Sequence, residues 1–400
     1  VYSSLISLKK SADTTNALFN ITSLGVKTNR DDWVYNFSLK TLQNTIETSL
    51  ETYRNDLSHF DYKKFQSKIP SNTKKADYYR FLDNEITTDD TLSWIRSLKN
   101  YFLRLETLEN YDEKHVRVAT YRPFVKTHLY FKSEWVEAQR EFRKLCPTQE
   151  SKNIFICAVK NYFSIFILDN IADTNLMGIS GGITAYPLYT YENNTQEYAI
   201  STDYLNKFRE HYKDNAISYE DIFYYTYGIL HHKGFKETYK IYLQKEDPKI
   251  PLSKDFKKIS ELGKELANLH LNYETNPLKH ESFEILGDRN DPKTYEVEKM
   301  KIKDKTTKES IIYNSHITIT NIPSIAYDYK LCGNSVVESY MKNMSVKISK
   351  KAKNKEGDFI IDNPNDFKGG KYIFETFLRV IDLSIKSVEL IEKISHLSYE

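Results

Sequence analysis

The clearest pattern of apolar and polar positions lies at residues 218–271, where the spacing of apolar side chains predicts three consecutive helices. Ser218 and Asp221 have the spacing of a capping box, in which each side chain bonds a free backbone N–H at the start of a helix. Gly234 is expected to separate the first helix from the second. This stretch contains no catalytic motif, and we interpret it as a packed helical block against which its neighbours lean.

Short runs rich in β-branched and aromatic residues predict strands on both sides of this block. The first group lies within 114–190 and the second within 281–320, where the polar turn 303–307 is expected to close a hairpin. A helix is predicted at 135–142, between strands of the first group. The predicted strands are 116–118, 127–131, 153–159, 162–168, 183–190, 281–286, 295–301, 310–314 and 317–320.

Helical periodicity is also clear near both ends of the chain. Residues 1–110 are predicted to be mostly helical, with the best helices at 42–53 and 91–108. Near the C-terminus, helices are predicted at 336–344 and, long and amphipathic, at 372–394. We therefore predict an α+β fold, with mixed strand groups around a central helical block, an N-terminal helical segment and a long C-terminal helix.

Composition narrows the class of protein only a little. The chain has 400 residues, of which 40% are hydrophobic, and a formal net charge of +2, which neither favours nor excludes a nucleic-acid partner. The three cysteines are far apart and form no CxxC pair, so no structural zinc and no disulfide are expected. No apolar run is long enough to span a membrane, which favours a cytoplasmic protein. The start at Val1, without a methionine, suggests a fragment of a longer polypeptide.

Several stretches resemble one family in the same order along the chain. They are GVKTNRDDW at 25–33, YRPF at 121–124, YPLY at 186–189, YEDIFYYTYGILHHKGFKETYKIYLQKEDPKIPL at 219–252 and ELGKELANLHL at 261–271. This set resembles the C-terminal target-recognition region of single-chain restriction-modification enzymes of the Type ISP group. The chain departs from the family's pattern at 230–233, where a proline is missing, and at 332–334, where the family has GGY.

The resemblance implies that this chain recognises a DNA target and does not itself catalyse a reaction. Residues 111–400 would form the DNA target-recognition domain, and residues 1–110 would dock toward an upstream methyltransferase domain of the same polypeptide. The docking residues expected are Asn29, Arg30, Asp31 and Trp33. The intact enzyme would methylate adenine and cleave DNA, with S-adenosylmethionine, ATP and Mg needed only by domains outside this chain.

A search for catalytic motifs agrees with that expectation. The chain has neither the FxGxG loop nor the [DNS]PP[YF] loop of an amino-methyltransferase, and no GxxxxGK[ST] phosphate loop. His231 and His232 lack a third ligand at suitable spacing and are interpreted as the end of a helix. The glycine-rich run 178–182 is interpreted as a turn before a strand. We therefore predict no catalytic residue, no metal ligand and no cofactor for this chain.

Basic residues are the candidates for DNA contact, because lysine and arginine neutralise phosphates and arginine also reads guanine. Such runs also occur as solvated surfaces, so the alternative is a protein–protein interaction module without DNA contact, built on tyrosine-rich surfaces. The predicted DNA-binding residues are Arg117, Arg122, Lys126, Lys301, Lys303, Lys305, Lys347, Lys350, Lys351 and Lys353.

Overall fold

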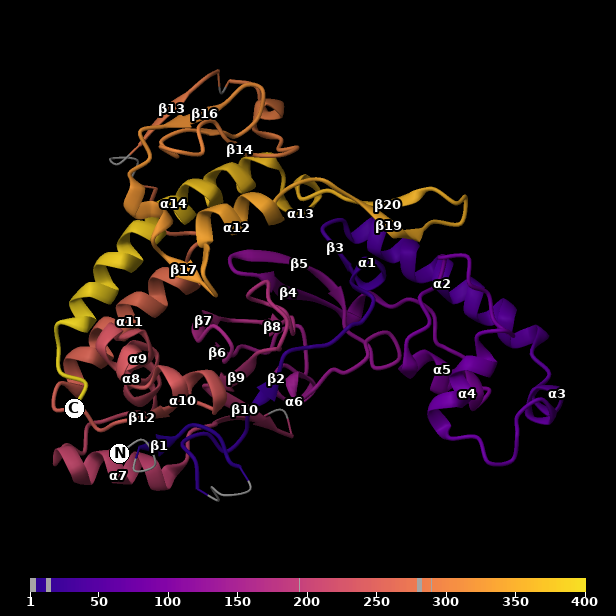
Figure 1. Cartoon of the computed structure of the whole chain (residues 1–400), viewed down its shortest axis with the longest axis horizontal. Coiled ribbons are helices and arrows are strands. Elements are labelled where there is room, and N and C mark those ends of the chain that lie inside the picture. The colour runs from indigo at the N-terminus through magenta and orange to yellow at the C-terminus, as the bar shows by residue number, and fades with distance from the viewer. Residues whose placement is uncertain (1–4, 12–15, 194, 279–282, 289) are drawn as a thin grey trace.

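The computed structural model describes residues 5–11, 16–193, 195–278, 283–288 and 290–400. Its described part is an α+β fold in which two four-stranded sheets lie in the middle, helices lie on either side, and a third four-stranded sheet lies near the C-terminal helix (Figure 1). This confirms the predicted fold class. Within the described part of the chain, no helix is long and apolar enough to cross a membrane.

The first central sheet has the strand order β2-β9-β6-β7, and all its pairs are antiparallel. Strands β6, β7 and β9 are short and almost wholly buried, as their apolar runs predict, whereas Leu24 of β2 is exposed. Their bounds are β2 Ser23–Leu24, β6 Phe155–Val159, β7 Ser164–Leu168 and β9 Thr184–Pro187.

The second central sheet has the order β3-β5-β4-β8, with β8 parallel to β4. Strands β4 and β5 form a hairpin whose turn places Phe124 at a φ of 61°, a left-handed conformation that is rare for a bulky side chain. Phe124 is fully buried, so its packing holds this turn. The bounds are β3 Tyr35–Asn36, β4 Val116–Arg122, β5 Val125–Tyr130 and β8 Ile171–Ala172.

The helix predicted at 135–142 is wrong. Those residues form turns and an isolated bridge in which Ala138 pairs with Lys27, and helix follows only at α6 (Phe142–Leu145). Ala138 and Lys27 exchange two backbone hydrogen bonds of 2.9 and 3.0 Å. This long-range pairing uses backbone groups that a local helix would need, so tertiary structure overrides the helical pattern.

The helical block consists of α8 (Tyr219–His231), α9 (Lys233–Thr238), α10 (Lys240–Lys245) and α11 (Phe256–Leu271). The capping box of Ser218 and Asp221 is confirmed. Gly234 does not separate two helices but lies inside α9, because the His232 ring caps α9 by accepting a hydrogen bond from the backbone N–H of Phe235.

Helices α8 and α11 are in close contact at two glycines, Gly228 and Gly263. A Cβ atom at Gly263 would lie 2.2 Å from the carbonyl oxygen of Tyr224, and one at Gly228 would lie 2.7 Å from that of Ile259. Only glycine at both positions allows this close crossing. The long C-terminal helix α14 (Gly370–Ser395) packs across α8 and α11 (Figure 1).

The N-terminal helices project from the body as a separate lobe on the right of Figure 1. The helix predicted at 42–53 is confirmed and is longer, whereas that predicted at 91–108 is confirmed only for α5. The bounds are α1 Asp31–Val34, α2 Leu39–His59, α3 Tyr62–Ser67, α4 Lys75–Leu82 and α5 Arg96–Leu103.

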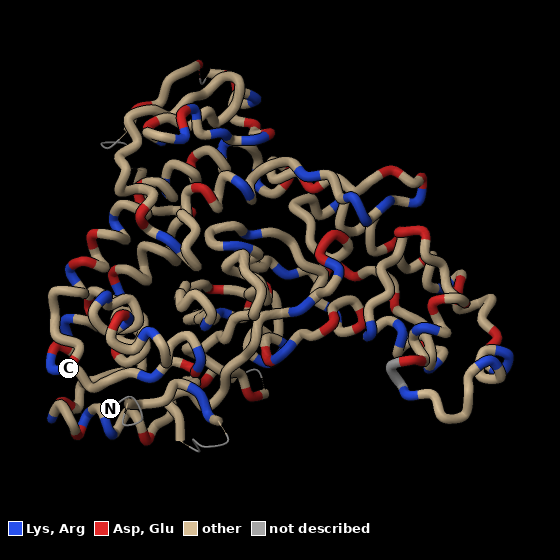
Figure 2. Tube along the Cα trace, in the orientation of Figure 1, with Lys and Arg blue, Asp and Glu red and all other residues tan. Residues whose placement is uncertain are grey.

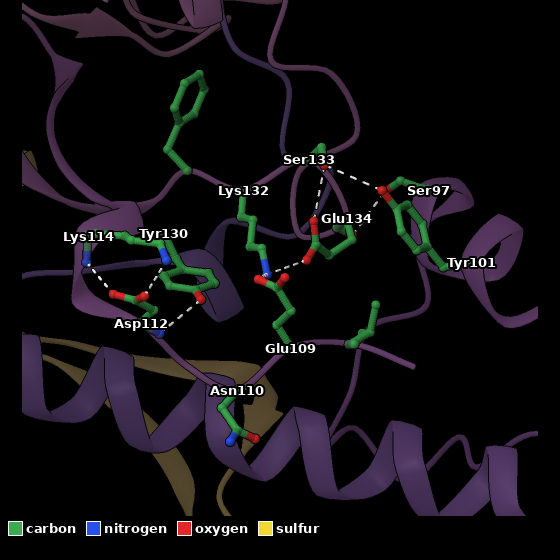
Figure 3. A network of polar contacts seen from close by, with 12 residues as sticks. Ser97, Tyr101, Glu109, Asn110, Asp112, Lys114, Tyr130, Lys132, Ser133 and Glu134 are labelled. Atoms are coloured by element: carbon green, nitrogen blue, oxygen red, sulfur yellow. Dashed lines mark hydrogen bonds and ion pairs between the residues drawn. The ribbon is translucent and has the colours of Figure 1, made fainter. Parts of the chain in front are cut away.

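Ion pairs connect the segment after α5 to the end of β5. The Lys132 ammonium lies 3.0 Å from the Glu109 carboxylate and 2.8 Å from that of Glu134, while Asp112 pairs with Lys114 at 2.6 Å (Figure 3). Lys132 is mostly buried, so it is held between two carboxylates and not presented to solvent. This network holds the helical lobe against the second central sheet.

The C-terminal part carries the third sheet, with the order β13-β16-β15-β14, and the predicted hairpin at 303–307 is confirmed between β14 and β15. The strand predicted at 295–301 is wrong except at its end: a 3-10 turn ends at Tyr295, and 296–300 are irregular up to the start of β14. The predicted residues 281 and 282 lie outside the described residues. The bounds are β13 Glu284–Leu286, β14 Lys301–Ile302, β15 Ile311–Ile312 and β16 Thr318–Thr320.

The remaining elements include two further hairpins, β17–β18 and β19–β20, on either side of the predicted helix α12, which is confirmed. Their bounds are β17 Lys330–Leu331, β18 Asn334–Ser335, α12 Val336–Asn343, β19 Lys347–Lys353, β20 Phe359–Asp362 and α13 Asn365–Lys368. Near the helical block lie β1 Ile6–Ser7, β10 Tyr189–Glu192, β11 Thr195–Tyr198, α7 Thr202–Tyr212 and β12 Lys249–Ile250.

The first strands of the chain pair with strands far along it. Strand β1 pairs with β12, β2 with β9 and β3 with β5. These three N-terminal strands are therefore part of the same sheets as later segments. The domain boundary near residue 110 stays a prediction.

Candidate nucleic-acid interface

Three adjoining cavities form a cleft beside the central sheets. Their volumes are about 630, 300 and 820 Å³. Asp31 and Asp32 line both the first and the second, Asn175 lines the first and the third, and Tyr121 and Lys347 line the second and the third. Because each cavity shares lining residues with the other two, we treat them together as the central cleft.

The two walls of the central cleft come from different parts of the chain. One wall is built by the segment before and through α1, the end of β4, and the loop 174–183 between β8 and β9. The other is built by the β17–β18 hairpin, α12 and the β19–β20 hairpin. In Figure 1 α12 and the β19–β20 hairpin lie above the central sheets, and β17 lies to their left. The fold thus brings residues near 30, near 175 and near 340 to one place.

Basic residues outnumber acidic ones in this lining. Figure 2 shows lysine and arginine spread along the whole trace, so the overall charge of +2 hides this local excess. The basic lining residues are Lys27, Arg30, Arg122, Arg140, Lys308, Lys330, Lys342, Lys347, Lys350 and Lys351. The acidic ones are Asp31, Asp32, Glu338 and Asp362.

The floor of the cleft holds a connected set of polar side chains. The Tyr121 hydroxyl donates a 2.8 Å hydrogen bond to Asp31, and the Arg122 guanidinium donates one of 2.8 Å to Asp173. The guanidinium also lies 3.8 Å from the centre of the Tyr121 ring. Burial, with the nearby Asp31 carboxylate, raises the pKa of Asp173 to about 6 although Arg122 opposes that shift. Two carboxylates and one arginine thus share a largely buried site.

Arg30 lies in the wall of the first cavity and is almost completely buried. Its guanidinium lies 5.1 Å from the ring centre of Trp135 and 5.8 Å from that of Trp33. None of its side-chain nitrogens has a hydrogen-bond partner among the described residues. Burial lowers the pKa of Arg30 to about 9. The two indole rings therefore provide the only described stabilisation of this buried cation.

The β19–β20 hairpin is fastened to the first wall. The Asn36 amide donates a 3.2 Å hydrogen bond to the carbonyl of Ile361, and the backbone N–H of Phe37 donates one of 2.9 Å to Asp362. The Ser349 hydroxyl donates one of 2.8 Å to Asp32. These contacts join the end of the second central sheet and α1 to the hairpin, and they fix the hairpin at the edge of the cleft.

Two of the predicted DNA-binding residues already bond other groups of the protein. Arg117 donates hydrogen bonds to three backbone carbonyls, of Lys114, Val116 and Pro147, and burial lowers its pKa. The Lys126 ammonium is mostly buried, 2.7 Å from Glu274 and 3.3 Å from Asp169. Neither residue lines the central cleft. Their geometry favours a structural role.

The other predicted residues divide by position. Lys301, Lys303 and Lys305 are exposed on the β14–β15 hairpin but do not line the cleft. Lys353 is half-buried, and its ammonium lies 5.5 Å from the centre of the Phe359 ring. The residues that the structure brings to the cleft are Arg122, Lys347, Lys350 and Lys351.

The segment predicted to dock a methyltransferase is mostly internal. Arg30 and Trp33 are buried, and Asp31 accepts hydrogen bonds from the hydroxyls of Thr28 and Tyr121. Asn29 is exposed in the left-handed conformation, with a φ of 58°. Burial assigns Arg30 and Trp33 an internal packing role, and of the four predicted residues only Asn29 is exposed.

Four further lysine and arginine residues, for which the sequence predicts no site role, are exposed and line the cleft: Lys27, Arg140, Lys330 and Lys342. They are far from one another in sequence except for Lys330 and Lys342, and only the fold brings them together. The glycine-rich loop at 178–182 also lines the cleft, and Gly178, Gly181 and Gly182 all have positive φ. Its composition was a visible signal, but its position beside α12 was not.

The other candidates for chemistry have structural partners. His231 bonds the backbone carbonyl of Tyr227 and His232 bonds that of Leu397. The three cysteines are buried free thiols. Among the described residues there is no group of three or more His, Cys, Asp or Glu placed to hold a metal ion.

Comparison with known proteins defines the class. The chain belongs to the family of Type ISP C-terminal specificity domains, whose family model matches residues 17–376. A search of the curated proteins finds no match.

Three solved structures share the fold over nearly the whole chain. The ATP-dependent Type ISP restriction-modification enzyme LlaBIII bound to DNA is 32% identical, with a TM-score of 0.83, over 100% of this chain and 24% of its own. A nuclease-deletion mutant of the Type ISP enzyme LlaGI with a DNA substrate mimic is 30% identical, with a TM-score of 0.83, over 100% of this chain and 29% of its own. The DrdV–DNA complex, at 22% identity, a TM-score of 0.81 and coverage of 99% and 38%, shows the fold alone. The chain thus spans about a quarter of the Type ISP enzymes that it matches.

Proposed function

We propose that this chain binds duplex DNA in the central cleft and acts as the target-recognition part of a longer restriction-modification polypeptide. The observation that carries the proposal is the excess of basic residues lining the cleft, contributed by both walls. A phosphate backbone requires local positive charge, so a chain with a net charge of only +2 is suited to DNA if its cations are gathered in one place.

Three lysines that line the cleft are free to bind phosphates, which supports the proposal. Lys330, Lys342 and Lys347 are exposed and form no ion pair within the described part of the chain. By contrast, Lys308 pairs with Glu338 at 3.0 Å, and Arg122 pairs with Asp173. Free lysines can exchange their counterions for phosphates at once, whereas the paired groups must first leave a carboxylate. Lys330, Lys342 and Lys347 are therefore the phosphate contacts we expect to matter most.

In this proposal the chemistry lies elsewhere in the polypeptide. Adenine methylation with S-adenosylmethionine, ATP-driven motion and Mg-dependent cleavage belong to domains outside this chain, which spans about a quarter of LlaBIII. The chain would position the duplex for those domains and would have no methyltransferase, nuclease or ATPase activity by itself.

The contact with the methyltransferase domain is a separate part of the proposal. Asn29 and Asp32 are the exposed polar groups of the segment 29–33, beside the first cavity. We propose that this rim, with the helical lobe that follows it, faces the methyltransferase domain, while Arg30 and Trp33 support it from within.

The test is DNA affinity across a salt series. The 400-residue chain is titrated against a fluorescent mixed-sequence duplex between about 50 and 200 mM salt, a range in which phosphate contacts dominate the change in affinity. Replacing Lys330, Lys342 and Lys347 together by Ala should weaken binding to all sequences alike. It should lower the slope of log K against log salt by up to about 2.7, because each phosphate contact contributes about 0.9.

A matched control separates the cleft from general charge. Lys254, Lys257 and Lys258 are exposed at the start of α11, do not line the cleft, and carry the same total charge. Their replacement by Ala should leave the slope nearly unchanged. Equal effects of the two triple variants would reject the cleft as the binding surface. No binding by the parent chain at 50 mM salt would instead favour the interaction module without DNA contact.

A further inference from the structure

The β19–β20 hairpin carries an exposed apolar ridge. Ile348 and Ile361 face each other directly across the two strands and are 62% and 52% exposed. Phe359, two residues before Ile361 on the same strand, is 48% exposed. Residues two apart on a strand share a face, so these three side chains form one apolar ridge on the outer face of the hairpin. We call it the hairpin ridge.

The opposite face of the hairpin is already occupied. Ala352 and Ile360 are buried, and the hydrogen bonds from Asn36 and Phe37 attach β20 to the end of the second central sheet. The hairpin is therefore a fixed element with one inner face and one outer face. The apolar side chains of the hairpin ridge do not contribute to the core, and their exposure has no explanation in the folding of this chain.

Cations surround the hairpin ridge. Lys347, Lys350, Lys351 and Lys353 all lie on the same strand as Ile348. Lys347, Ile348 and Lys350 line the second cavity of the cleft, and Lys351 lines the first. Of the three ridge side chains only Ile348 lines the cleft, so the ridge starts at the edge of the cleft and continues along the hairpin away from it. An apolar strip among lysines suits a partner that is strongly anionic outside and presents flat, partly apolar groups inside.

We propose that the hairpin ridge reads base edges in the major groove of DNA bound in the cleft, with Ile348 and Ile361 contacting thymine methyl groups. The inference rests on the proposed function and adds to it the residues that select sequence. The major groove is about 12 Å wide and admits a two-stranded β-ribbon, and the thymine methyl is exposed only there. The lysines beside the ridge would meet the phosphates on either side of that groove.

Charge complementarity selects this occupant over a protein surface. A protein partner for an apolar ridge usually removes charge from the centre of the contact, whereas here one seven-residue strand carries four lysines. Those lysines would have to be desolvated against a protein, but against DNA they replace counterions. Apolar contacts at the centre and cations at the rim are together the pattern expected of direct readout.

The test is a selection of preferred sequences from a duplex library with a random central segment, using the 400-residue chain. The double variant Ile348→Ser/Ile361→Ser should lose the parent's preference for T·A pairs at one or two positions, each by about tenfold, and should keep its affinity for mixed-sequence DNA. Replacing thymine by deoxyuridine at those positions should weaken the parent similarly and leave the double variant unaffected.

A matched control is available elsewhere on the surface. Ile241 on α10 and Leu286 on β13 are 66% and 52% exposed, close to the ridge pair, and neither lines the cleft. The variant Ile241→Ser/Leu286→Ser should select the same sequences as the parent. Any equal change in both double variants would indicate a general effect of surface polarity and would reject the inference.

The outcomes distinguish this inference from the proposed function. An unchanged sequence ranking in the ridge variant, or a loss of affinity spread evenly over all sequences, would overturn base reading by the ridge even if the lysine triple variant had abolished binding. A parent chain that binds duplex with the expected salt slope but prefers no sequence would also overturn it, while the proposed function stands. A ridge that instead packs against another domain would alter assembly of the full-length enzyme and leave the ranking intact, which again rejects the inference.

Discussion

In the helical block the buried His270 ring has a hydrogen-bond partner at each nitrogen, whereas in the wall of the cleft the buried Arg30 guanidinium has none among the described residues. Ser387 uses its hydroxyl hydrogen on the carbonyl of Leu383, so its oxygen accepts from Nε2 of His270, and Nδ1 of His270 accepts from Tyr227. The ring is thereby fixed as a neutral imidazole that joins α8, α11 and α14.

This difference between the helical block and the cleft agrees with a structural role for the block and a binding role for the cleft. Fully satisfied polar networks make a core rigid and specify one arrangement. Unsatisfied or strained groups are costly and persist where function requires them. The helical block therefore serves as the scaffold, while the cleft keeps charged groups and exposed apolar side chains that a partner can use.

The two regions also differ in the sign of their response to acid. Burial lowers the pKa of His270 to about 3, so the folded state binds this proton less readily than the unfolded chain does. Stability from His270 is complete above about pH 6.5 and is lost as the pH falls toward 3. Asp173, with its pKa raised to about 6, behaves in the opposite way, because its contribution grows as the pH falls from 6 toward 3.8.

The largest effect should come from the contact between α8 and α11. Gly263→Ala would place a Cβ atom 2.2 Å from the carbonyl oxygen of Tyr224, and the helices would have to separate. We expect a loss of about 3 kcal/mol in the free energy of unfolding, measured by urea denaturation. The control Glu261→Ala, exposed on the same helix, should change it by less than about 0.5 kcal/mol. A Gly263→Ala variant as stable as the control would show that the block tolerates movement.

The helical block and the cleft should respond to acid in opposite ways. The slope of unfolding free energy against pH should be reduced in His270→Gln by up to about 1.4 kcal/mol per pH unit between pH 6 and 4.5. In Asp173→Asn the loss of stability on acidification should become steeper, since the compensating gain is removed. Urea unfolding at pH 4.5, 5.5 and 7 measures both slopes. Slopes that change in the same direction would contradict the contrast between the regions.

Removing the unpaired cation should be favourable. Arg30→Met keeps an unbranched side chain between the two tryptophans and removes a buried charge, so the free energy of unfolding should rise by about 1 kcal/mol. The matched change Arg209→Met should instead lower it by about 1 kcal/mol, because the Arg209 guanidinium donates a 2.9 Å hydrogen bond to the carbonyl of Ile217 beside the block. Destabilisation by both changes would mean that Arg30 has a stabilising partner after all.

The smallest effect should come from the hairpin ridge. Ile361→Ala should change the free energy of unfolding by less than about 0.5 kcal/mol, because the side chain is largely exposed. Ile259→Ala, at a fully buried position of α11, should lower it by about 3 kcal/mol. Thermal unfolding of the two variants is sufficient to compare them. A large loss for Ile361→Ala would assign the ridge to the folding of the chain and leave no reason to expect a partner there.

The sequence predicts best those elements whose pattern is local. The capping box at Ser218 and the long amphipathic helix α14 follow from residue types at fixed spacings, and both are confirmed. The strand predicted at 295–301 fails for a reason that spacing does not reveal. There the backbone N–H and C=O of Val297 bond the side chain of Asn365, and Asn314 bonds the carbonyls of Thr294 and Glu296, so side chains take the groups that a strand partner would use.

The site shows the same limit. Lys347, Lys350 and Lys351 are visible as a charge run, and the fold brings them to the cleft. Lys330 and Lys342 have no such signal, because they become neighbours of the cleft only through the packing of β17 and α12. For Lys126 the reverse is true. Its charge is visible in the sequence, but the sequence does not reveal that Glu274, far along the chain, neutralises it.

The two ends of the chain are held by one short segment. Strand β1 pairs with β12, and the backbone N–H of Leu8 donates to the carbonyl of Pro248. A few residues later, Ser253 bonds the carbonyl of Ser398, and the backbone N–H of Lys254 bonds that of Glu400. In mechanical terms, a pull on both ends would load residues 248–254 from two sides, together with the bonds of His232 to Leu397 and of Thr238 to Tyr399. The force would enter the molecule at the edge of the helical block, away from the residues that line the cleft.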